Sequence, residues 1–517
     1  MTSDLGAPLP ASDPALDRLA RFDGTGFQPV GPGTIDAAIV HVFAHGWQPG
    51  YRVQERLLAT ADGVSALPAW DPRLVDSTGR ALIADYLGLL QALAGLGPDH
   101  AVLWYSWLDE SATEADVFQA HRSRQATQVN GRRLAMAVQL ALAHRRGRVH
   151  LIGHSHGSAV VTHAAVSMTL PPAQVTLLDA PEDPISRLGG ASDLIDLVLP
   201  RLRPGRERGT TFVDSYASVF GRPYHRRPGL SAVVDVLLGA PLVFTRDPVK
   251  AINAAHLYPV EWYARSVRAV SGADPVRPGE RPGMRRRDKR PGRHSAPVGY
   301  GWSPLTGDDP VRLHSWYHAP LPQRPLVLRR HVGEPVAAAS RRVFGRLEPA
   351  AGVAPRRPVP VRLDLTPGGP AAAIVVSAPG EQLIEFDLQL RDATGGERLE
   401  IDLDGVPAFE ALAGHPVPRA GRYLMLSDGA PGEHLVTARL VGATGATRAE
   451  VLNLRLVAGP RAARGFTLSR SATTVFAAGV ITGSAATVLA TAGLGSLVRW
   501  VWLVSRRRLG RLPGAPR

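Results

Sequence analysis

The stretch VHLIGHSHGS, residues 149–158, contains the pattern Gly-x-Ser-x-Gly with Ser155 at its centre. The apolar residues before Gly153 are typical of a buried strand, and a helical pattern begins at Ser158. In such a strand-to-helix turn the glycines let neighbouring backbone approach, and the serine hydroxyl is presented at the carboxyl end of the sheet. The alternative is a glycine-rich turn without chemistry. We predict that Ser155 is the nucleophile of an acyl-transfer reaction.

A serine hydroxyl is a weak nucleophile at neutral pH, so it needs a general base and an acid that orients this base. Asp179 directly follows the apolar run 175–178, which places it at the carboxyl end of the next strand, beside Ser155. Asp214, in TTFVDSY, is the alternative acid at the end of the strand after that. We predict Asp179 as the acid.

Two histidines follow these acids before the chain becomes strongly basic. His225 lies in the arginine-rich segment RPYHRRPG, where solvent exposure is expected. His256 precedes an aromatic-rich amphipathic segment in NAAHLYPVEWYARSV, which could hold it against the edge of the sheet. Because a general base has to be fixed within reach of the nucleophile, we predict His256 as the base.

The oxyanion of an acyl-transfer intermediate needs two backbone amides. One is the amide of His156, directly after the nucleophile, and the other is the amide of Trp47, which Gly46 allows to turn towards Ser155. His45, His154 and His156 together resemble a metal cluster, but no carboxylate lies at ligand spacing. We therefore expect neither a metal nor a cofactor.

The elements that would position these residues alternate along the chain. Short apolar runs read as buried strands at Ile39–Phe43, Ala101–Trp104, Val149–Ile152, Val175–Leu178 and Thr211–Tyr216. Segments with helical spacing lie between them at Arg80–Leu96, Ala115–Ala143 and Ser158–Met168. This alternation predicts an α/β domain at 28–270, with a mostly parallel sheet and helices on both faces.

The remaining chain divides into segments of different composition. We expect a disordered leader at 1–27, a basic Pro/Gly linker at 271–303, an all-β sandwich-like domain of about seven strands at 359–458, a C-terminal hydrophobic helix at 471–498 and a basic tail at 499–517. Residues 304–358 carry no assignable pattern. The sandwich is indicated by short alternating runs that Pro, Gly and Asp separate.

Composition excludes several classes of protein. With 517 residues the chain is too long for one domain, and with no cysteine it has no disulfide, thiolate metal site or cysteine nucleophile. The net charge of +14 is concentrated in 265–300 and 461–517, away from the predicted folded domains. Nucleic acid is therefore not an expected partner.

Residues 471–498 carry no charge and are long enough to cross a bilayer, and they border Trp500, Trp502 and a cluster of arginines. The alternative is a small-residue helix packed on the sandwich.

Two rules disagree on which side of the membrane the catalytic domain lies. The basic tail places the catalytic domain outside, whereas the first 25 residues lack a secretion signal, which favours the cytoplasmic side. We expect a single C-terminal anchor in the cell membrane, with the catalytic domain weakly favoured on the cytoplasmic side.

Residues from about 39 to 266 resemble the catalytic domain of the pancreatic-lipase-like family of α/β-hydrolases. The resemblance rests on VHVFAHGW, QATQVNGRRLAMAVQL, GHSHG, VTLLDAPEDP, FVDSY and NAAHLYPVEWY, which occur in the family's order. It puts Asp179 and His256 in the places of the family's acid and base. The chain departs from the family in having no disulfide-clamped lid and in carrying His156 where leucine is usual.

We therefore predict a carboxylic-ester hydrolase of lipase or esterase type, with an ester or lipid substrate. The alternatives are a binding or adhesion protein that works through the sandwich, and a thioesterase or peptidase that uses the same triad. The apolar run at 230–244 is expected either as a mobile flap over Ser155 or as a buried element that completes the sheet. The oligomeric state is open.

Overall fold

The structure is a computed structural model of the chain. It describes residues 15–49, 57–60, 63–66, 82–113, 120–143, 147–181, 195, 198–205, 210–218, 221, 224, 229–230, 232–238, 248–271, 295–296, 299–306, the short strands between 313 and 335, and 362–458 without 368, 378–380, 394–395, 427–431 and 444–446.

The first domain is built on a nine-stranded sheet with the order β15-β12-β11-β10-β9-β3-β7-β1-β2. Its strands are β1 (Leu19–Phe22), β2 (Phe27–Pro29), β3 (Ile39–Ala44), β7 (His100–Tyr105), β9 (Arg148–His154), β10 (Gln174–Leu178), β11 (Phe212–Ala217), β12 (Val234–Leu237) and β15 (Leu326–Val327). Neighbours from β12 to β7 pair in parallel, and the outer pairs are antiparallel. The predicted mostly parallel sheet is confirmed.

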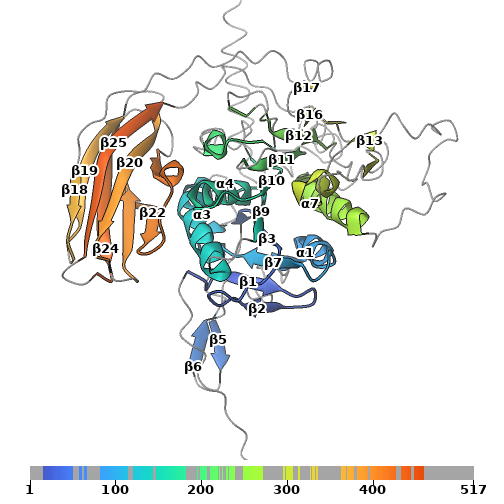
Figure 1. The fold of residues 1–517 in the computed structure, drawn as a ribbon, viewed down its shortest axis with the longest axis horizontal. Helices are drawn as coiled ribbons and strands as arrows, with labels where there is room; N and C mark the ends of the chain where they lie inside the picture. The colour runs from blue at the N-terminus through green and yellow to red at the C-terminus, as the bar shows by residue number, and fades with distance from the viewer. Residues whose placement is uncertain are drawn as a thin grey trace, which may run out of the picture.

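Helices cover both faces of this sheet (Figure 1). Helices α3 (Ala120–Leu142) and α4 (Gly157–Ser167) pack on one face, and α1 (Leu87–Ala94) and α7 (Pro248–Ser271) pack on the other. Successive residues of β3 alternate between the two layers, since Val40 and Val42 join the α3/α4 side whereas Ile39 and Phe43 join the α1/α7 side. Burial on both faces explains why the central strands appear as uninterrupted apolar runs.

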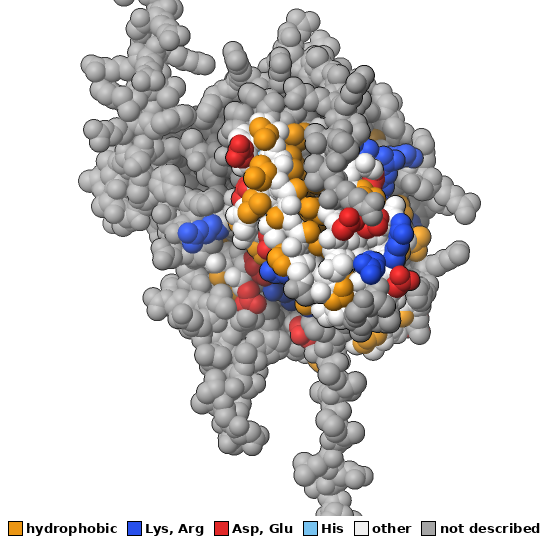
Figure 2. Space-filling model, turned by 90° about the vertical axis from the view of Figure 1, so that its left-hand side faces the viewer, with side chains coloured by type: hydrophobic (Ala, Val, Ile, Leu, Met, Phe, Trp, Pro, Cys, Tyr) orange, Lys and Arg blue, Asp and Glu red, His pale blue; other side chains and the backbone are white. Residues whose placement is uncertain are grey.

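The second domain is a sandwich of two antiparallel four-stranded sheets, with the orders β18-β25-β20-β23 and β19-β24-β21-β22. Its strands are β18 (Arg362–Leu365), β19 (Ala371–Ser377), β20 (Glu381–Arg391), β21 (Arg398–Leu403), β22 (Val406–Leu412), β23 (Tyr423–Met425), β24 (Gly432–Val441) and β25 (Arg448–Ala458). Figure 2 faces this domain and shows a band of hydrophobic side chains, and the most exposed apolar residues of β19 and β24 are Ile374, Val376 and Leu435.

Short elements complete the described chain. They are β4 (Gln48–Pro49), β5 (Leu57–Thr60), β6 (Gly63–Ala66), α2 (Leu108–Ser111), β8 (Ala112–Thr113), β13 (Ser295–Ala296), β14 (Leu313–His314), β16 (Arg329–His331), β17 (Glu334–Pro335) and the 3-10 turns at Leu82–Asp85, Leu199–Leu202, Gly299–Trp302, Pro304–Thr306 and Arg419–Gly421.

Side chains of α3 bind backbone groups of the sandwich in β22, in β23 and in the turn before β23. The guanidinium of Arg132, 1% exposed, donates to the carbonyls of Ala408, Gly421 and Tyr423 at 3.0, 2.9 and 2.6 Å. Gln128 makes two hydrogen bonds to β23. Its Nε2 donates to the Tyr423 carbonyl at 2.6 Å, and its Oε1 accepts from the Met425 amide at 3.0 Å. The sandwich is therefore fixed to the α3 side of the first domain.

Two expected boundaries are wrong. The leader does not extend to residue 27, because β1 and β2 form the antiparallel edge of the large sheet and Leu19 is fully buried. The basic linker does not extend to residue 303, because the turn at Gly299–Trp302 packs on α7 and its Tyr300 is 1% exposed. In both places a few apolar residues within an otherwise polar stretch are buried in the core, so the stretch is part of the folded domain.

The segment 230–244, which was expected either as a flap or as a buried element of the sheet, contributes a strand to the sheet as far as the structure describes it. Val234–Leu237 is strand β12, which pairs in parallel with β11. Leu230, Val233 and Leu238 beside it are buried. The alternative, a strand that completes the sheet, accounts for this apolar run, and residues 239–244 lie outside the described residues.

In the part of the chain that the structure describes, no helix combines the length and the apolar character that a bilayer crossing requires. The predicted span at 471–498, the basic tail at 499–517 and His225 all lie outside the described residues.

Candidate active site

Ser155 lies in the turn between β9 and α4 and has a φ of 53°. A positive φ is strained for a serine, and such strain persists only where surrounding contacts impose it. The following Gly157 is one such contact. A Cβ at Gly157 would come within 2.3 Å of the Ala44 carbonyl oxygen and 2.5 Å of the His45 carbonyl oxygen. The backbone at the end of β3 therefore packs directly against the turn that carries Ser155.

The loop after β3 also reaches Ser155 itself. A Cβ at Gly46 would come within 2.6 Å of Ser155 Cβ and 3.2 Å of Ser155 Oγ. The chain at residues 46–47, from which the Trp47 amide was expected to face the oxyanion, thus lies against the serine side chain. Residue 46 has to be glycine at this distance.

His45 anchors that loop from inside the protein. It is fully buried, and its Nδ1 lies 2.8 Å from the Gly46 carbonyl oxygen, to which only a protonated nitrogen can donate. Its Nε2 then accepts from the Trp107 amide at 3.2 Å, while Trp107 Nε1 donates to the His45 carbonyl at 2.7 Å. Burial lowers the pKa of His45 to about 4, so the ring is neutral at neutral pH.

Asp179 follows β10 directly, with a φ of 47°, and its side chain is fully buried. Its Oδ1 accepts from the amides of Ser218 and Gly221 at 2.7 and 2.9 Å, and its Oδ2 lies 2.7 Å from His256 Nδ1. Burial by itself would raise the pKa of Asp179. The hydrogen bond and charge of His256, together with the two amides, outweigh burial and hold this pKa below its usual range.

His256 lies inside α7, three residues before Pro259, rather than ahead of the helix. Its side chain is 16% exposed, so one edge of the ring is open to solvent. The ring packs on that of His154, the residue before Ser155, with centroids 4.5 Å apart. His154 therefore connects the strand that leads to Ser155 with α7, while Asp179 binds Nδ1 of His256.

His154 was considered in the sequence only as part of a metal cluster, but it makes specific contacts in the site. Its Nε2 lies 3.1 Å from the His256 carbonyl oxygen and therefore donates to it, which leaves Nδ1 to accept from the Tyr86 hydroxyl at 3.2 Å. Burial lowers the pKa of His154 to about 3. This neutral ring holds the backbone of α7 at His256.

His156 begins α4, so its amide belongs to the amino-terminal end of that helix, where a developing negative charge is favoured. Its ring Nδ1 lies 3.0 Å from Ser123 Oγ and its plane stacks on Trp47, with centroids 6.3 Å apart. Burial lowers the pKa of His156 to about 3. The two residues whose amides were expected to hold the oxyanion, His156 and Trp47, are therefore in contact through their rings.

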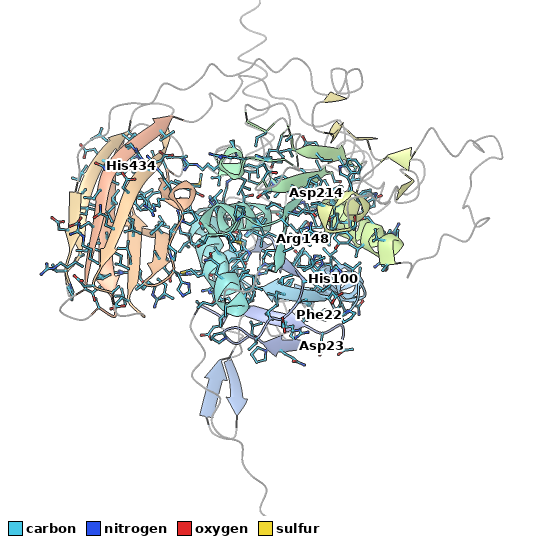
Figure 3. The ribbon with its side chains drawn as sticks, viewed as in Figure 1. Phe22, Asp23, His100, Arg148, Asp214 and His434 are labelled. Carbon is cyan, nitrogen blue, oxygen red and sulfur yellow. The ribbon has the colours of Figure 1, made fainter. Side chains whose placement is uncertain are left out.

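Asp214, the alternative acid, does not lie at the end of its strand. It is the third residue of β11 (labelled in Figure 3) and pairs with Thr176 of β10. Its carboxylate accepts from Thr176 Oγ1 at 2.6 Å, Tyr216 OH at 2.8 Å and Gln174 Nε2 at 3.2 Å. Burial raises its pKa to about 6. The structure thus pairs His256 with Asp179 and gives Asp214 a different set of partners.

Tyr86, Ser123 and Trp107 were not singled out in the sequence. They lie in or beside helices far from the motifs, and nothing in the spacing of their residues marks them. The one available signal is the aromatic residue type at Trp107, which comes two residues after the end of β7.

Comparison with known proteins gives little further information. No family model and no curated protein matches the chain. A crystal structure of a Bacillus licheniformis lipase, BlEst2, in its propeptide form is 12% identical, with coverage of 88% of this chain and 77% of the lipase and a TM-score of 0.16. At that TM-score the likeness carries no information on function, which rests on the geometry of the site.

Proposed function

We propose that the chain is a serine hydrolase of the α/β-hydrolase fold that cleaves carboxylic esters, with Ser155 as nucleophile, His256 as general base and Asp179 as the acid. The observation that carries the proposal is the 2.7 Å contact of Asp179 Oδ2 with His256 Nδ1. This contact forms where the adjacent strands β9 and β10 end, next to the strained Ser155 turn. Oriented base, acid and nucleophile are the parts that acyl transfer requires.

Each residue has a defined step in the reaction. Ser155 Oγ attacks the ester carbonyl carbon while its proton passes to His256 Nε2, and Asp179 stabilises the resulting imidazolium. The amides of Trp47 and His156 hold the oxyanion. Collapse of the tetrahedral intermediate expels the alcohol, which takes the proton from His256. Water then repeats the sequence on the acyl-enzyme and releases the carboxylic acid.

Covalent labelling tests the proposal directly. A long-chain fluorophosphonate should form one adduct that peptide mass spectrometry locates on Ser155, and Ser155→Ala should remove this adduct. Hydrolysis of long-chain p-nitrophenyl esters should disappear in the same variant, and a series of increasing chain length on the parent protein defines the acyl preference. Thioester and peptide substrates in parallel distinguish the two alternative hydrolase classes. A folded protein that carries no adduct on Ser155 would instead favour a binding function for the sandwich.

We also propose that residues 471–498 attach the protein to the cell membrane. The uncharged stretch with its basic and aromatic border supports this. The full chain should sediment with membranes in carbonate buffer, whereas a variant that ends at residue 460 should not. Protease added to intact cells then reports on which side the catalytic domain lies.

A further inference from the structure

A second serine, histidine and aspartate meet in the sandwich domain. Ser377 is the last residue of β19, His434 is the third residue of the neighbouring β24 (Figure 3), and Asp404 begins the turn between β21 and β22. Since β19, β24 and β21 are adjacent in one sheet, the three side chains lie side by side at its end. None of them belongs to the site around Ser155.

The distances are those of a charge-relay arrangement. Ser377 Oγ lies 3.0 Å from His434 Nε2, and His434 Nδ1 lies 2.8 Å from Asp404 Oδ2. The second oxygen, Asp404 Oδ1, accepts from the Leu435 amide at 2.8 Å. An ionised carboxylate only accepts, so His434 Nδ1 donates to Asp404, and an unprotonated Nε2 can accept from Ser377 Oγ, which also donates to the Gly432 carbonyl at the longer distance of 3.4 Å. The ring therefore has the tautomer of a general base for this serine.

The serine of this cluster is as buried as Ser155, whereas its carboxylate is far more exposed than that of Asp179. Ser377 is 4% exposed and His434 is 8% exposed, against 7% for Ser155. The Asp404 side chain is 45% exposed, so the cluster opens to solvent on the carboxylate side. The Gly432 amide donates to Ser377 Oγ at 3.2 Å and so helps to fix the position of the hydroxyl.

Anchoring the β21–β22 turn does not by itself require the imidazole. The Asp404 amide donates to the Leu435 carbonyl at 2.8 Å, and the Leu435 amide donates back to the Asp404 carboxylate. These two bonds already attach the turn to β24. His434 adds a directional link from the carboxylate to a serine hydroxyl, which is the feature that raises the nucleophilicity of serine.

We propose that Ser377 is a second nucleophilic serine, which His434 and Asp404 activate and which accepts the acyl group of small, unhindered esters. Ser377 Oγ forms a bond to the carbonyl carbon as its proton moves to His434 Nε2. The bond from that carbon to the alcohol oxygen then breaks, and His434 returns the proton to the departing alcohol. Because Ser377 is 4% exposed, bulky acyl chains are excluded.

A small phosphonylating reagent tests this in the full chain that carries Ser155→Ala, so that failure of the first site cannot affect the result. Diisopropyl fluorophosphate should give one adduct per chain, on Ser377. His434→Gln, which keeps a neutral polar side chain, should slow labelling by about 100-fold, and Asp404→Asn should also slow it. His415→Ala is the matched control, because His415 lies beyond the opposite end of β21, and it should label at the parental rate.

Thermal melting of each variant shows whether it is folded. If Ser155→Ala keeps the parental Tm and Ser377 stays unlabelled, the proposal is wrong. It is equally wrong if folded His434→Gln labels Ser377 as fast as its parent, because the serine would then react without its base.

Discussion

Asp179 and His256 are 77 positions apart in the chain, yet Asp179 Oδ2 lies 2.7 Å from His256 Nδ1. Both oxygens of the carboxylate are occupied, since Oδ1 accepts the Ser218 and Gly221 amides. The carboxylate therefore cannot rotate away from the ring without losing three hydrogen bonds. The two backbone amides on one oxygen and the imidazole on the other therefore fix the geometry of the Asp179–His256 pair.

Asp179→Asn and Asp214→Asn distinguish the two candidate acids. Asp179→Asn should lower kcat for ester hydrolysis by about 10⁴-fold, because an amide cannot orient the ring or stabilise its cationic form. Asp214→Asn should change kcat only a few-fold, because Asp214 binds Thr176 and Tyr216 in mid-sheet. Steady-state kinetics of both purified variants checks this. A severe loss in Asp214→Asn with an active Asp179→Asn would reverse the assignment.

Gly157→Ala should disrupt the turn that carries Ser155. The new Cβ would lie 2.3 Å from the Ala44 carbonyl oxygen, which is backbone and cannot move aside. We expect a loss of stability of about 3 kcal/mol or more, together with the loss of activity. Gly88→Ala, in α1 with no atom within 4 Å of the new Cβ, is the control and should be neutral or slightly stabilising. Chemical unfolding of both variants measures the difference.

The central strands could be predicted from sequence because burial on both faces leaves a continuous apolar run. Ile39–Phe43 and Val175–Leu178 were expected, and β3 and β10 extend each by one residue. Strand β1 was missed, because a strand of only four residues, LARF, has too little pattern to separate it from a leader. The run at 230–244 was ambiguous, since a buried strand and a flap are both apolar.

The site could be predicted in part. Ser155 and Asp179 each directly follow an apolar strand run, so strand order places them at the same end of the sheet, and the contact of Asp179 with His256 agrees with the predicted pair. The role of His154 could not be predicted, because it depends on the α7 backbone and on Tyr86, 68 positions away. The binding of Arg132 to carbonyls nearly 300 positions away likewise depends on how two domains dock, which no local pattern records.

His154→Ala should impair catalysis by displacing the base. Without the donor at 3.1 Å from the His256 carbonyl and the ring packed on His256, α7 is free to shift, and a displacement of about 1 Å costs on the order of 100-fold in kcat. KM should change little, because His154 is buried and acts through His256. His154→Gln, which retains a donor, should recover part of kcat. An unchanged kcat in folded His154→Ala would contradict this role.

Acid should destabilise the protein below about pH 6.5. Burial lowers the pKa of a group of fully buried histidines, namely His41, His45, His150, His154, His156 and His163. Between these lowered values and the unfolded value of 6.5 the unfolded chain binds more protons, so the free energy of unfolding falls as pH falls. Asp214 opposes this, because its raised pKa of about 6 makes the folded state bind the extra proton between about pH 4 and 6.

Urea unfolding at intervals from pH 4 to pH 7.5 measures this dependence. Because six histidines oppose one aspartate, the free energy of unfolding should rise with pH across most of the range. A flat profile from pH 5 to 7 would show that these rings are not held neutral. Asp214→Asn should steepen the profile, because it removes the opposing group.

Arg132→Met should separate the sandwich from the first domain. Burial lowers the pKa of Arg132 to about 10, so the side chain is still charged at neutral pH, and it lies between the rings of Phe409 and Tyr423, at 4.4 and 5.0 Å from their centroids. Methionine fills a similar volume but leaves three sandwich carbonyls without this donor. The expected cost is about 3–5 kcal/mol, because partners of a buried charge lose their hydrogen bonds together.

Calorimetry and limited proteolysis show whether the two domains unfold separately in this variant. Arg132→Met should give two thermal transitions and an early cut that releases the sandwich. Arg133→Met is the matched control on the next residue of α3. Arg133 is 24% exposed, and its partner Glu410 keeps the bond from Arg398 at 3.0 Å, so this variant should unfold nearly as the parent does. If Arg132→Met melted in one transition at the parental Tm, docking of the sandwich would depend on the remaining contacts and not on this guanidinium.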